Sequence, residues 1–447
     1  MDVLEEIRRS RMSRFQVVAV AIALALIMID GFDVAVMAYA APTLSREWGI
    51  DAVTLGFLLS ASLFGMAAGS IFLTPLADRI GRRKLTIISL VIISIGMVLS
   101  VFSGGATDLM IWRVLTGLGV GGMMANLNVL VAEYASDARR GSIIGIYTAG
   151  YPIGATIGGL VAGPFIPLYG WQALFAIGAA LTVIMLAVSW KFLPESLDYL
   201  LTRRPPKALE RINGILARIG RAPVTALPPV AVALEQKSAI GEVLTRPVRF
   251  RTLMLWIGYA CLVAAYYFAN TWTPKIMATA SGSDSVGVTT GVIANAGGII
   301  GCFVFSALAV KFRSQLLLVA ALGGAAVAYL IFGLVFSQVG VAMVLALFLG
   351  ILTTAGIAGF YATSPGVYTA RARATGVGWM IGLGRLVSIV APILVGYLIS
   401  GGWQPENVFF LFAIPLAAAA LCIVALGYSL KRSGAPLGVE AVPAATH

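Results

Sequence analysis

Residues 15–41 read FQVVAVAIALALIMIDGFDVAVMAYAA. This stretch is apolar along nearly its whole length, and a helix that rises 1.5 Å per residue would carry it across a hydrocarbon core roughly 30 Å thick. Two carboxylates, Asp30 and Asp33, lie inside it. A buried charge at bilayer depth is costly and marks a functional site by default. The stretch therefore predicts a membrane-spanning helix that takes part in transport.

The composition agrees with a membrane protein. Hydrophobic residues make up 59% of the chain and charged residues only 11%, whereas soluble domains carry about 25% charged residues. The charged N-terminus and the length of the first apolar run do not fit a cleavable signal peptide, so we expect this span to remain in place. No organelle-targeting segment is seen, which favours a bacterial cytoplasmic (inner) membrane.

A window of about 19 residues finds twelve apolar spans. The polar, basic interval 194–250 separates six of them from the other six. We therefore predict an all-α membrane protein built from an N-terminal six-helix bundle (1–193), a cytoplasmic central loop (194–250), a C-terminal six-helix bundle (251–432) and a cytoplasmic tail (433–447). The expected spans are 15–41, 53–76, 85–103, 108–132, 142–165, 171–193, 251–274, 286–310, 315–337, 341–363, 374–399 and 406–430.

The positive charges predict the orientation. Of the 31 Lys and Arg residues, 27 flank the N-terminus, alternate loops, the central loop and the C-terminal tail. This asymmetry places both termini in the cytoplasm. A basic inner rim that faces anionic membrane lipid also explains the net charge of +12 without nucleic acid as a partner.

The two halves share a short repeat. Ala138-Arg139-Arg140-Gly141-Ser142 opens the fifth span, and Ala372-Arg373-Ala374-Thr375-Gly376 opens the eleventh. A repeat at this offset indicates two similar bundles. In transporters of this kind the substrate binds between the repeats near the midplane, and rocking of the bundles alternates access.

The loop between the second and third spans reads Pro75-Leu76-Ala77-Asp78-Arg79-Ile80-Gly81-Arg82-Arg83-Lys84. Its acid and cations can make charge-assisted hydrogen bonds to a neighbouring helix end and so close a cytoplasmic gate. The matching loop of the second half, residues 310–313, has two cations and no acid. The alternatives are an ordinary basic inner loop and, for Glu133, a solvated helix-end acid. The residues expected to gate are Asp78, Arg79, Gly81, Arg82, Arg83, Glu133, Arg139 and Arg373.

This loop resembles the signature G-x-L-A-D-R-x-G-R-R/K of the major facilitator superfamily, with Thr74 in place of the first glycine. Within that superfamily the chain is similar to the aromatic acid:proton symporters over nearly its whole length. The resemblance implies import of benzoate-like anions together with protons. It is carried by Asp30-Gly31-Phe32-Asp33, Arg113-Val114-Leu115-Thr116-Gly117-Leu118-Gly119, Asn126, Glu133-Tyr134, Arg373-Ala374-Thr375-Gly376 and Gly382-Leu383-Gly384-Arg385.

The charges inside the spans lead to a compatible interpretation. Away from the span ends they are Asp30, Asp33, Arg113 and Arg385. Arg385 lies about ten residues into its span, near mid-bilayer, where its planar guanidinium suits bidentate contact with a substrate carboxylate. Arg113 and Asp33 both lie toward the outer side and are expected to pair. We predict that Asp30 and Asp33 couple protons to transport, with Asp33 favoured because it lies nearer the outside. The alternative is that both acids only hold helices together.

An aromatic acid also needs flat walls and a few polar groups. Ordinary core packing is the alternative for each candidate, and Trp272 and Trp403 are expected to be anchors at the outer membrane surface instead. With Arg385 and Arg113, the expected substrate-binding residues are Asn126, Tyr151, Tyr266, Tyr267, Asn270, Asn295 and Trp379.

Other classes of protein fit less well. The only histidine is His447, and no residues have the spacing of metal ligands or of an activated nucleophile, so we expect no enzyme, no metal and no cofactor. The glycines of residues 117–122 lack a following lysine and do not form a nucleotide loop. Proton-driven efflux stays open as an alternative, although Ala155 occupies the place of the proline in the exporter motif. An uncoupled channel or receptor is a further alternative. The expected partners are an aromatic acid anion, protons and membrane lipid, and the protein is expected to act as a monomer.

Overall fold

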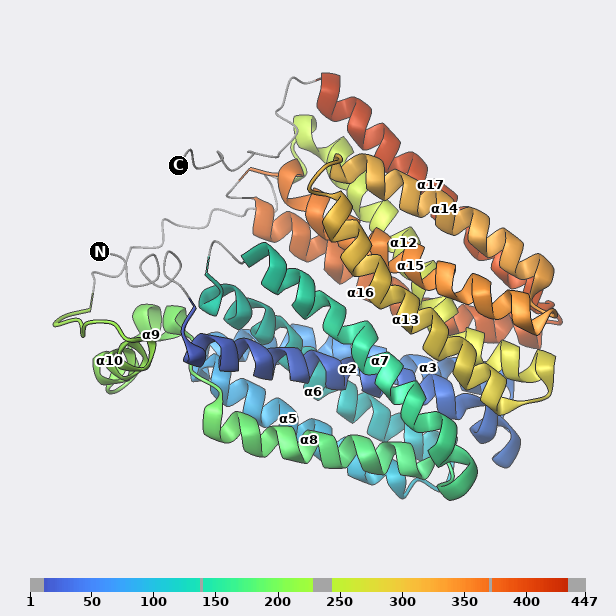
Figure 1. Cartoon of the computed structure of the whole chain (residues 1–447), viewed down its shortest axis with the longest axis horizontal. Coiled ribbons are helices and arrows are strands. Elements are labelled where there is room, and N and C mark those ends of the chain that lie inside the picture. The colour runs from blue at the N-terminus through green and yellow to red at the C-terminus, as the bar shows by residue number, and fades with distance from the viewer. Residues whose placement is uncertain (1–11, 137–139, 228–242, 370–371, 433–447) are drawn as a thin grey trace.

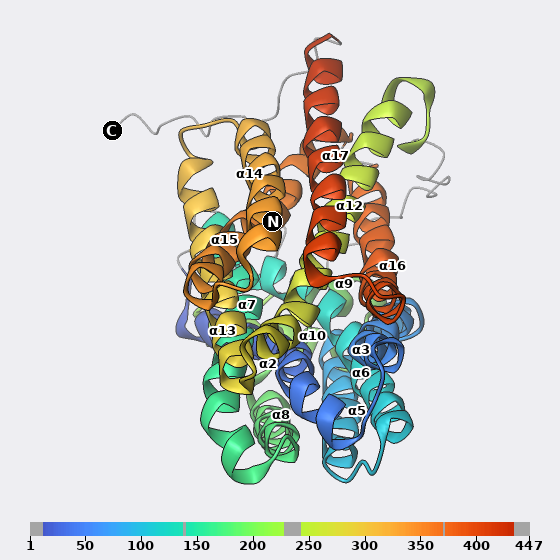
Figure 2. The same cartoon turned by 90° about the vertical axis from the view of Figure 1, so that its right-hand side faces the viewer.

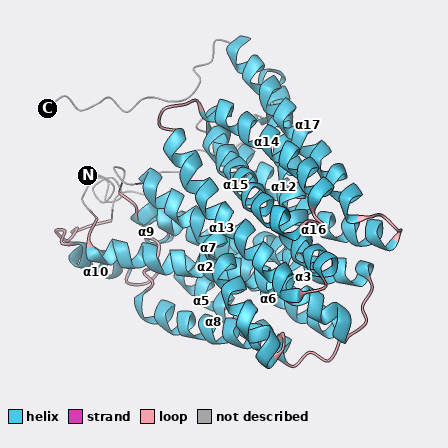
Figure 3. Ribbon diagram, turned by 45° about the vertical axis from the view of Figure 1, so that its right-hand side comes forward, coloured by secondary structure: helices cyan, strands magenta, loops and turns pink. Residues whose placement is uncertain are grey.

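The computed structural model describes residues 12–136, 140–227, 243–369 and 372–432, and in these ranges all regular structure is helical (Figure 3). Twelve helices are long and apolar enough to cross a membrane. They match the twelve predicted spans and confirm the fold class. The largest differences are at α2, which continues to Glu47, and at α12, which runs from Arg246 to Ser281.

The helices fall into two groups of six spans with two short helices between them. The first group is α2 (Arg14–Glu47), α3 (Ala52–Phe72) with its continuation α4 (Thr74–Ile80), α5 (Arg82–Val101), α6 (Ala106–Tyr134), α7 (Arg140–Tyr169) and α8 (Gln172–Phe192). Between the groups lie α9 (Leu197–Arg203) and α10 (Ala208–Ile219). The second group is α12 (Arg246–Ser281), α13 (Asp284–Leu308), α14 (Ser314–Val335), α15 (Val339–Thr363) with the 3₁₀ turn η2 (Ser364–Val367), α16 (Arg373–Ser400) and α17 (Pro405–Arg432).

Local signals set several helix ends. Ser13 and Gln16 form a capping box at the start of α2, where each side chain accepts a hydrogen bond from the other residue's backbone N–H. Asp51 caps α3 by accepting from the backbone of Thr54 at 2.9 Å, and the contacts with Thr54 lower the pKa of the Asp51 carboxyl. Gly81 has φ +102° and separates α4 from α5.

The two groups form two bundles that meet at one end and diverge toward the other (Figures 1 and 2). α2 begins, α17 ends, and α9 and α10 lie at the divergent end (Figure 1). We call this the inner end, following the predicted orientation, and the opposite end the outer end.

The seam between α3 and α16 shows how the bundles meet. Near the outer end, Ser60 donates to the carbonyl of Ile389 at 2.8 Å, and a Cβ at Gly56 would lie only 2.8 Å from the carbonyl oxygen of Pro392. Further inward on α3, Phe64, Ile71 and Phe72 are 57%, 63% and 74% exposed. The α3–α16 seam is therefore closed at the outer end, while the inner part of α3 is exposed.

One prediction about the surface is wrong. Trp272 was expected at the outer membrane surface, but it is 2% exposed and donates to the carbonyl of Pro392 at 3.1 Å. The reason is that α12 continues to Ser281, so Trp272 lies well inside the helix and not at its end. Trp403, by contrast, is partly exposed in the loop between α16 and α17.

Candidate functional site

The best-defined polar contact inside the first bundle joins α2 and α6. The two terminal nitrogens of Arg113 donate to the two carboxylate oxygens of Asp33 at 2.6 and 2.7 Å, and one also donates to the backbone carbonyl of Asp33 at 3.1 Å. Ser62 of α3 donates to the same carboxylate at 3.2 Å, and the Phe175 ring lies 5.5 Å from the guanidinium. Both charged side chains are fully buried. The predicted pair is confirmed, and it forms a neutral unit within one bundle.

Asp30 lies one turn inward on α2 in a different environment. It is buried, and its Oδ1 has no hydrogen-bond partner among the described residues. The charged side chains that interact electrostatically with Asp30 are Asp33 and Arg385. Asp33 is already paired with Arg113, and within the described ranges Asp30 forms no ion pair with Arg385 of α16, so these two charges act on each other only at longer range across the two bundles.

Tyrosines from both bundles lie within electrostatic range of Asp30 or Arg385. Tyr151 of α7 and Tyr266 of α12 lie within electrostatic range of Asp30, and Tyr267 lies within range of both Asp30 and Arg385. The rings of Tyr266 and Tyr267 meet edge to face with centroids 5.4 Å apart. The hydroxyl of Tyr151 has no described hydrogen-bond partner. The structure thus brings these three predicted residues together around the charges.

Three further tyrosines belong to the same region and were not predicted. Tyr147 of α7 lies within electrostatic range of Asp30. Tyr259 of α12 lies within range of Arg385 and shares a hydrogen bond of 3.1 Å with Tyr361 of α15. A signal for two of them was present, because Tyr147 precedes Tyr151 by four residues and Tyr259 precedes Tyr266 by seven. Residues at these separations share a face of a helix.

Asn270 and Asn295 form a polar network that also reaches the first bundle. The amide of Asn295 donates to Asn270 at 3.4 Å and to the hydroxyl of Tyr39 at 3.3 Å, and that hydroxyl donates to the carbonyl of Ala155 at 3.1 Å. The Nδ2 of Asn270 has no hydrogen-bond partner in the described part of the chain. Asn126 instead donates to Gly122 on its own helix at 2.8 Å.

Trp379 lies apart from Asp30 and Arg385. It is 51% exposed and stacks on Trp256, with ring centroids 6.1 Å apart and planes 25° apart. The indole of Trp256 donates to the carbonyl of Gly376 near the inner end of α16 at 3.0 Å. Trp379 thus lies nearer the inner end of α16 than Arg385, and its part in substrate binding stays a prediction.

Two of the predicted gate residues, Arg82 and Glu133, belong to a charge cluster at the inner end. Arg82 lies 3.6 Å from Glu133 and 3.6 Å from Asp198. Glu133 accepts hydrogen bonds from the Ser196 hydroxyl at 2.9 Å and the Leu197 backbone at 3.0 Å. Glu133 is therefore confirmed as a partner of the loop, and the alternative of a solvated acid does not hold because the residue is buried.

A second acid of the cluster was missed. Glu195 accepts from the backbone of Arg83 at 3.0 Å, and a Cβ at Gly81 would lie 2.5 Å from its carboxylate. Tyr134 donates to the backbone carbonyl of Glu195 at 2.8 Å. Charge complementarity in the sequence could have indicated this contact, because the acids Glu195 and Asp198 directly follow the sixth span and lie on the same side as the basic loop.

The remaining gate candidates make fewer contacts. Asp78 and Arg79 are exposed, and the carbonyl of Arg79 accepts from Tyr199 at 3.4 Å. Arg373 donates to the carbonyl of Pro365 at 3.1 Å, and Arg139 lies outside the described residues. The charge cluster thus ties the α4–α5 turn to α6 and α9 within the first bundle, while the inner part of α3 beside it is exposed.

A contact between the bundles at the outer end was also missed. Arg46, at the end of α2, forms an ion pair with Asp284, at the start of α13. Thr43 donates to the same carboxylate at 3.0 Å. These contacts help to hold the outer end closed.

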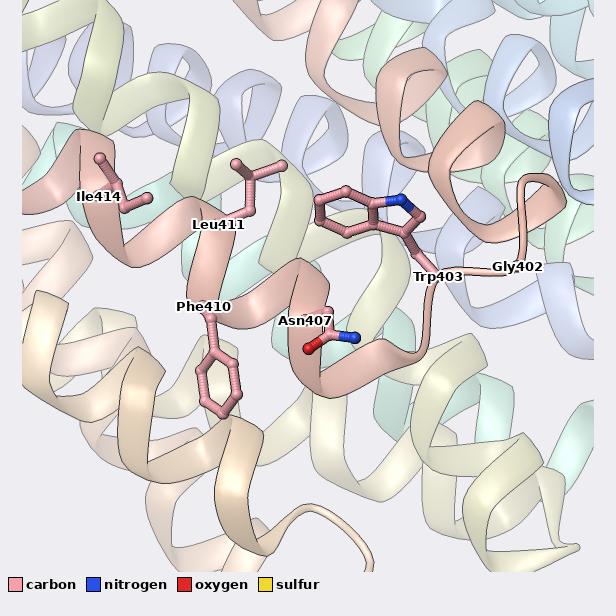
Figure 4. Close-up of a pocket in the computed structure, with 6 residues that line it drawn as sticks. All are labelled: Gly402, Trp403, Asn407, Phe410, Leu411 and Ile414. Carbon is pink, nitrogen blue, oxygen red and sulfur yellow. The ribbon is translucent and has the colours of Figure 1, made fainter.

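A shallow groove of about 400 Å³ lies elsewhere, at the turn between α16 and α17 (Figure 4). Neither Asp30 nor Arg385 is part of it. Its lining is mostly apolar, which suits a surface that faces lipid. It is lined by Gly402, Trp403, Asn407, Phe410, Leu411 and Ile414.

Comparisons with known proteins identify the family of the chain. Residues 23–359 match the family model described as Major Facilitator Superfamily. The chain is 29% identical to the gallate transporter of Pseudomonas putida, covering 97% of this chain and 96% of that protein. It is 28% identical to the 4-hydroxybenzoate transporter PcaK of Pseudomonas aeruginosa, covering 96% of each chain.

A third relative and a solved structure complete the comparison. The benzoate transport protein of Acinetobacter baylyi is 29% identical, covering 90% of this chain and 87% of that protein. The partially occluded inward open xylose transporter XylE from E. coli matches with a TM-score of 0.71 at 17% identity, covering 91% and 98% of the two chains. These relatives are named as transporters and not as enzymes. The chain therefore belongs to the Major Facilitator Superfamily.

Proposed function

We propose that this protein imports an aromatic carboxylate together with protons across a bacterial inner membrane, with both termini in the cytoplasm. The observation that carries the proposal is the placement of Asp30 on one bundle and Arg385 on the other, within electrostatic range of each other and of tyrosines from both bundles. The names of the relatives, which include transporters of gallate, 4-hydroxybenzoate and benzoate, support the substrate class.

Arg385 is the proposed counter-ion of the substrate. Its planar guanidinium can donate two parallel hydrogen bonds to a carboxylate. Arg113 is less suited to this role, because both of its terminal nitrogens already donate to Asp33. The rings of Tyr151, Tyr266 and Tyr267 supply the aromatic walls.

Asp30 is the proposed proton carrier. When a substrate carboxylate binds Arg385, it neutralises the one cation of the described residues that acts electrostatically on Asp30. A buried carboxylate without a counter-ion takes up a proton in preference to remaining charged. Substrate and proton binding thus favour each other. The sequence favoured Asp33 for this role, but Asp33 is held by Arg113 and Ser62, whereas Asp30 has a free oxygen.

Alternating access would require the contacts between the bundles to form and break in turn at the outer and inner ends. In the described arrangement the outer end is held by the Arg46–Asp284 pair and by the α3–α16 contacts, while the inner part of α3 is exposed. This state would release substrate into the cytoplasm. The outward-facing state would have to break these contacts and close the inner seam, as in transporters built from two repeats.

Uptake into proteoliposomes tests the proposal. Labelled benzoate, 3-hydroxybenzoate, 4-hydroxybenzoate, protocatechuate, gentisate and gallate are offered with and without an inward proton gradient. Accumulation that collapses with a protonophore is the expected result. No uptake of any of these acids, together with gradient-driven movement of a cationic drug, would instead support efflux.

A further inference from the structure

A hollow of about 530 Å³ opens at the inner end of the first bundle, between the α4–α5 turn and α9. Three of its lining residues are cations, Arg79, Lys84 and Arg203, and none is acidic. We call this hollow the basic pocket. It is also lined by Ile80, Tyr199, Pro205 and Pro206.

The three cations lack carboxylate partners. Within the described ranges, none of them forms an ion pair. The nearby acids are engaged elsewhere, because Asp198 pairs with Arg82 and Glu195 accepts from the backbone of Arg83. Like charges that share a pocket repel one another, and a bound anion relieves that repulsion.

One hydrogen bond and two left-handed residues shape the backbone around the basic pocket. Tyr199 donates to the carbonyl of Arg79 and so connects the two walls. Arg204 and Lys207, on either side of Pro205 and Pro206, have φ values of +49° and +63°. Left-handed backbone is costly for residues other than glycine and persists where the surrounding structure holds it, often at binding sites.

Exposed aromatic residues indicate the level of the basic pocket relative to the lipid headgroups. Phe72 at the inner end of α3, and Trp190 and Phe192 at the inner end of α8, present large apolar surfaces to the outside. Aromatic side chains of membrane proteins gather at the level of the lipid headgroups. Arg83 donates to the carbonyl of Trp190 and so ties the α4–α5 turn to this level.

We propose that the basic pocket binds the phosphate group of an anionic ligand, and that its depth and charge suit the headgroup of an inner-leaflet lipid such as phosphatidylglycerol. Arg79 and Arg203 would donate to phosphate oxygens, and Lys84 would add a point charge. Ile80 and the two prolines would contact the glycerol. The bound phosphate would bridge α4 and α9, the segments that flank the inner charge cluster.

Ligand titration of the purified full chain in a non-ionic detergent tests this site. The probes are dioctanoyl phosphatidylglycerol, zwitterionic dioctanoyl phosphatidylcholine and inorganic phosphate, and binding is measured by native mass spectrometry and by thermal unfolding. We expect phosphatidylglycerol to bind more tightly than phosphatidylcholine. Displacement of the lipid by millimolar phosphate would show that free phosphate also enters the pocket, and no displacement would show that the lipid alone does.

Matched variants locate the binding. The pair Lys84→Gln and Arg203→Gln is expected to weaken phosphatidylglycerol binding on the order of tenfold, since each interfacial cation contributes about one decade or less. The charge-retaining pair Lys84→Arg and Arg203→Lys should bind nearly as well as the unmodified chain, and it controls for misfolding.

The control for general charge loss is the pair Lys311→Gln and Arg313→Gln. These exposed cations lie in the loop between α13 and α14, outside the basic pocket. An equal loss of phosphatidylglycerol affinity in this control pair, or none in the pocket pair, overturns the proposal. If the pocket pair fails to fold, the single variant Lys84→Gln provides the same comparison with a smaller shift.

Discussion

The side chains of Asp33 and Arg113 form a bidentate ion pair, in which each carboxylate oxygen accepts from one terminal guanidinium nitrogen, at 2.6 and 2.7 Å. Neither side chain is exposed. The desolvation cost of two buried charges is offset only while both are present. The pair therefore acts as one unit in the packing of α2 against α6.

Removing one partner should destabilise the protein strongly. For Arg113→Gln we expect a loss of about 3–5 kcal/mol, because Asp33 would remain buried without its cation. The double variant Asp33→Asn with Arg113→Gln should recover a large part of that loss. Thermal unfolding of the four proteins in detergent, analysed as a double-mutant cycle, measures the coupling. Additive effects of the two single changes would contradict this prediction.

Neutralising Asp30 should uncouple transport. Asp30→Asn removes the proposed proton carrier but leaves Arg385 free to hold a substrate carboxylate. We expect gradient-driven accumulation to disappear, while exchange of internal for external substrate continues. Asp30→Glu, which keeps an ionisable group, is the control and should retain some accumulation. Full accumulation by Asp30→Asn would remove Asp30 from the coupling mechanism.

Changing Arg385 should weaken substrate binding. Two charge-assisted hydrogen bonds are lost in Arg385→Gln, so we expect the Kd to rise by about 10- to 100-fold, and by less in Arg385→Lys, which keeps the charge. Calorimetric titration with the best substrate measures the Kd. Arg313→Gln, an exposed change in the loop before α14 and away from the site, is the control and should leave the Kd unchanged.

Gly81 should not tolerate a side chain. Its φ of +102° disfavours other residues, and a Cβ would lie 2.5 Å from the carboxylate of Glu195. We expect Gly81→Ala to cost about 1–3 kcal/mol of stability. Gly378→Ala, where no atom lies within 4 Å of the added Cβ, is the matched control and should not lower the melting temperature. Equal melting temperatures for the two variants would disprove the expected strain.

The hydropathy of the sequence predicted the twelve spans, and the signs of its charged residues predicted two polar contacts, Asp33–Arg113 and Glu133–Arg82. The Asp33–Arg113 pair could be predicted because only four charges lie inside the spans away from the span ends, so few pairings were available. The Glu133–Arg82 contact followed from a basic loop beside a helix-end acid. Both predictions depend on the high cost of a charge without a partner.

Contacts that depend on helix length or on distant loops could not be predicted in the same way. Arg46 and Asp284 are 238 residues apart, and nothing local indicates that the ends of α2 and α13 meet. Trp272 was misplaced because the apolar window ends before α12 does. The roles of Glu195 and Asp198 were missed because the orientation rule counts cations and ignores the acids that pair with them.

The neutrality of the Asp33–Arg113 pair has a consequence for the driving force. Because both partners belong to the same bundle, the proposed rocking would move them together and carry no net charge of this pair through the membrane. A potential of 100 mV does about 2.3 kcal/mol of work on each elementary charge that crosses. If one proton accompanies one carboxylate, the cargo is also neutral. The cycle would then be electroneutral and would respond to the pH difference alone, not to the membrane potential.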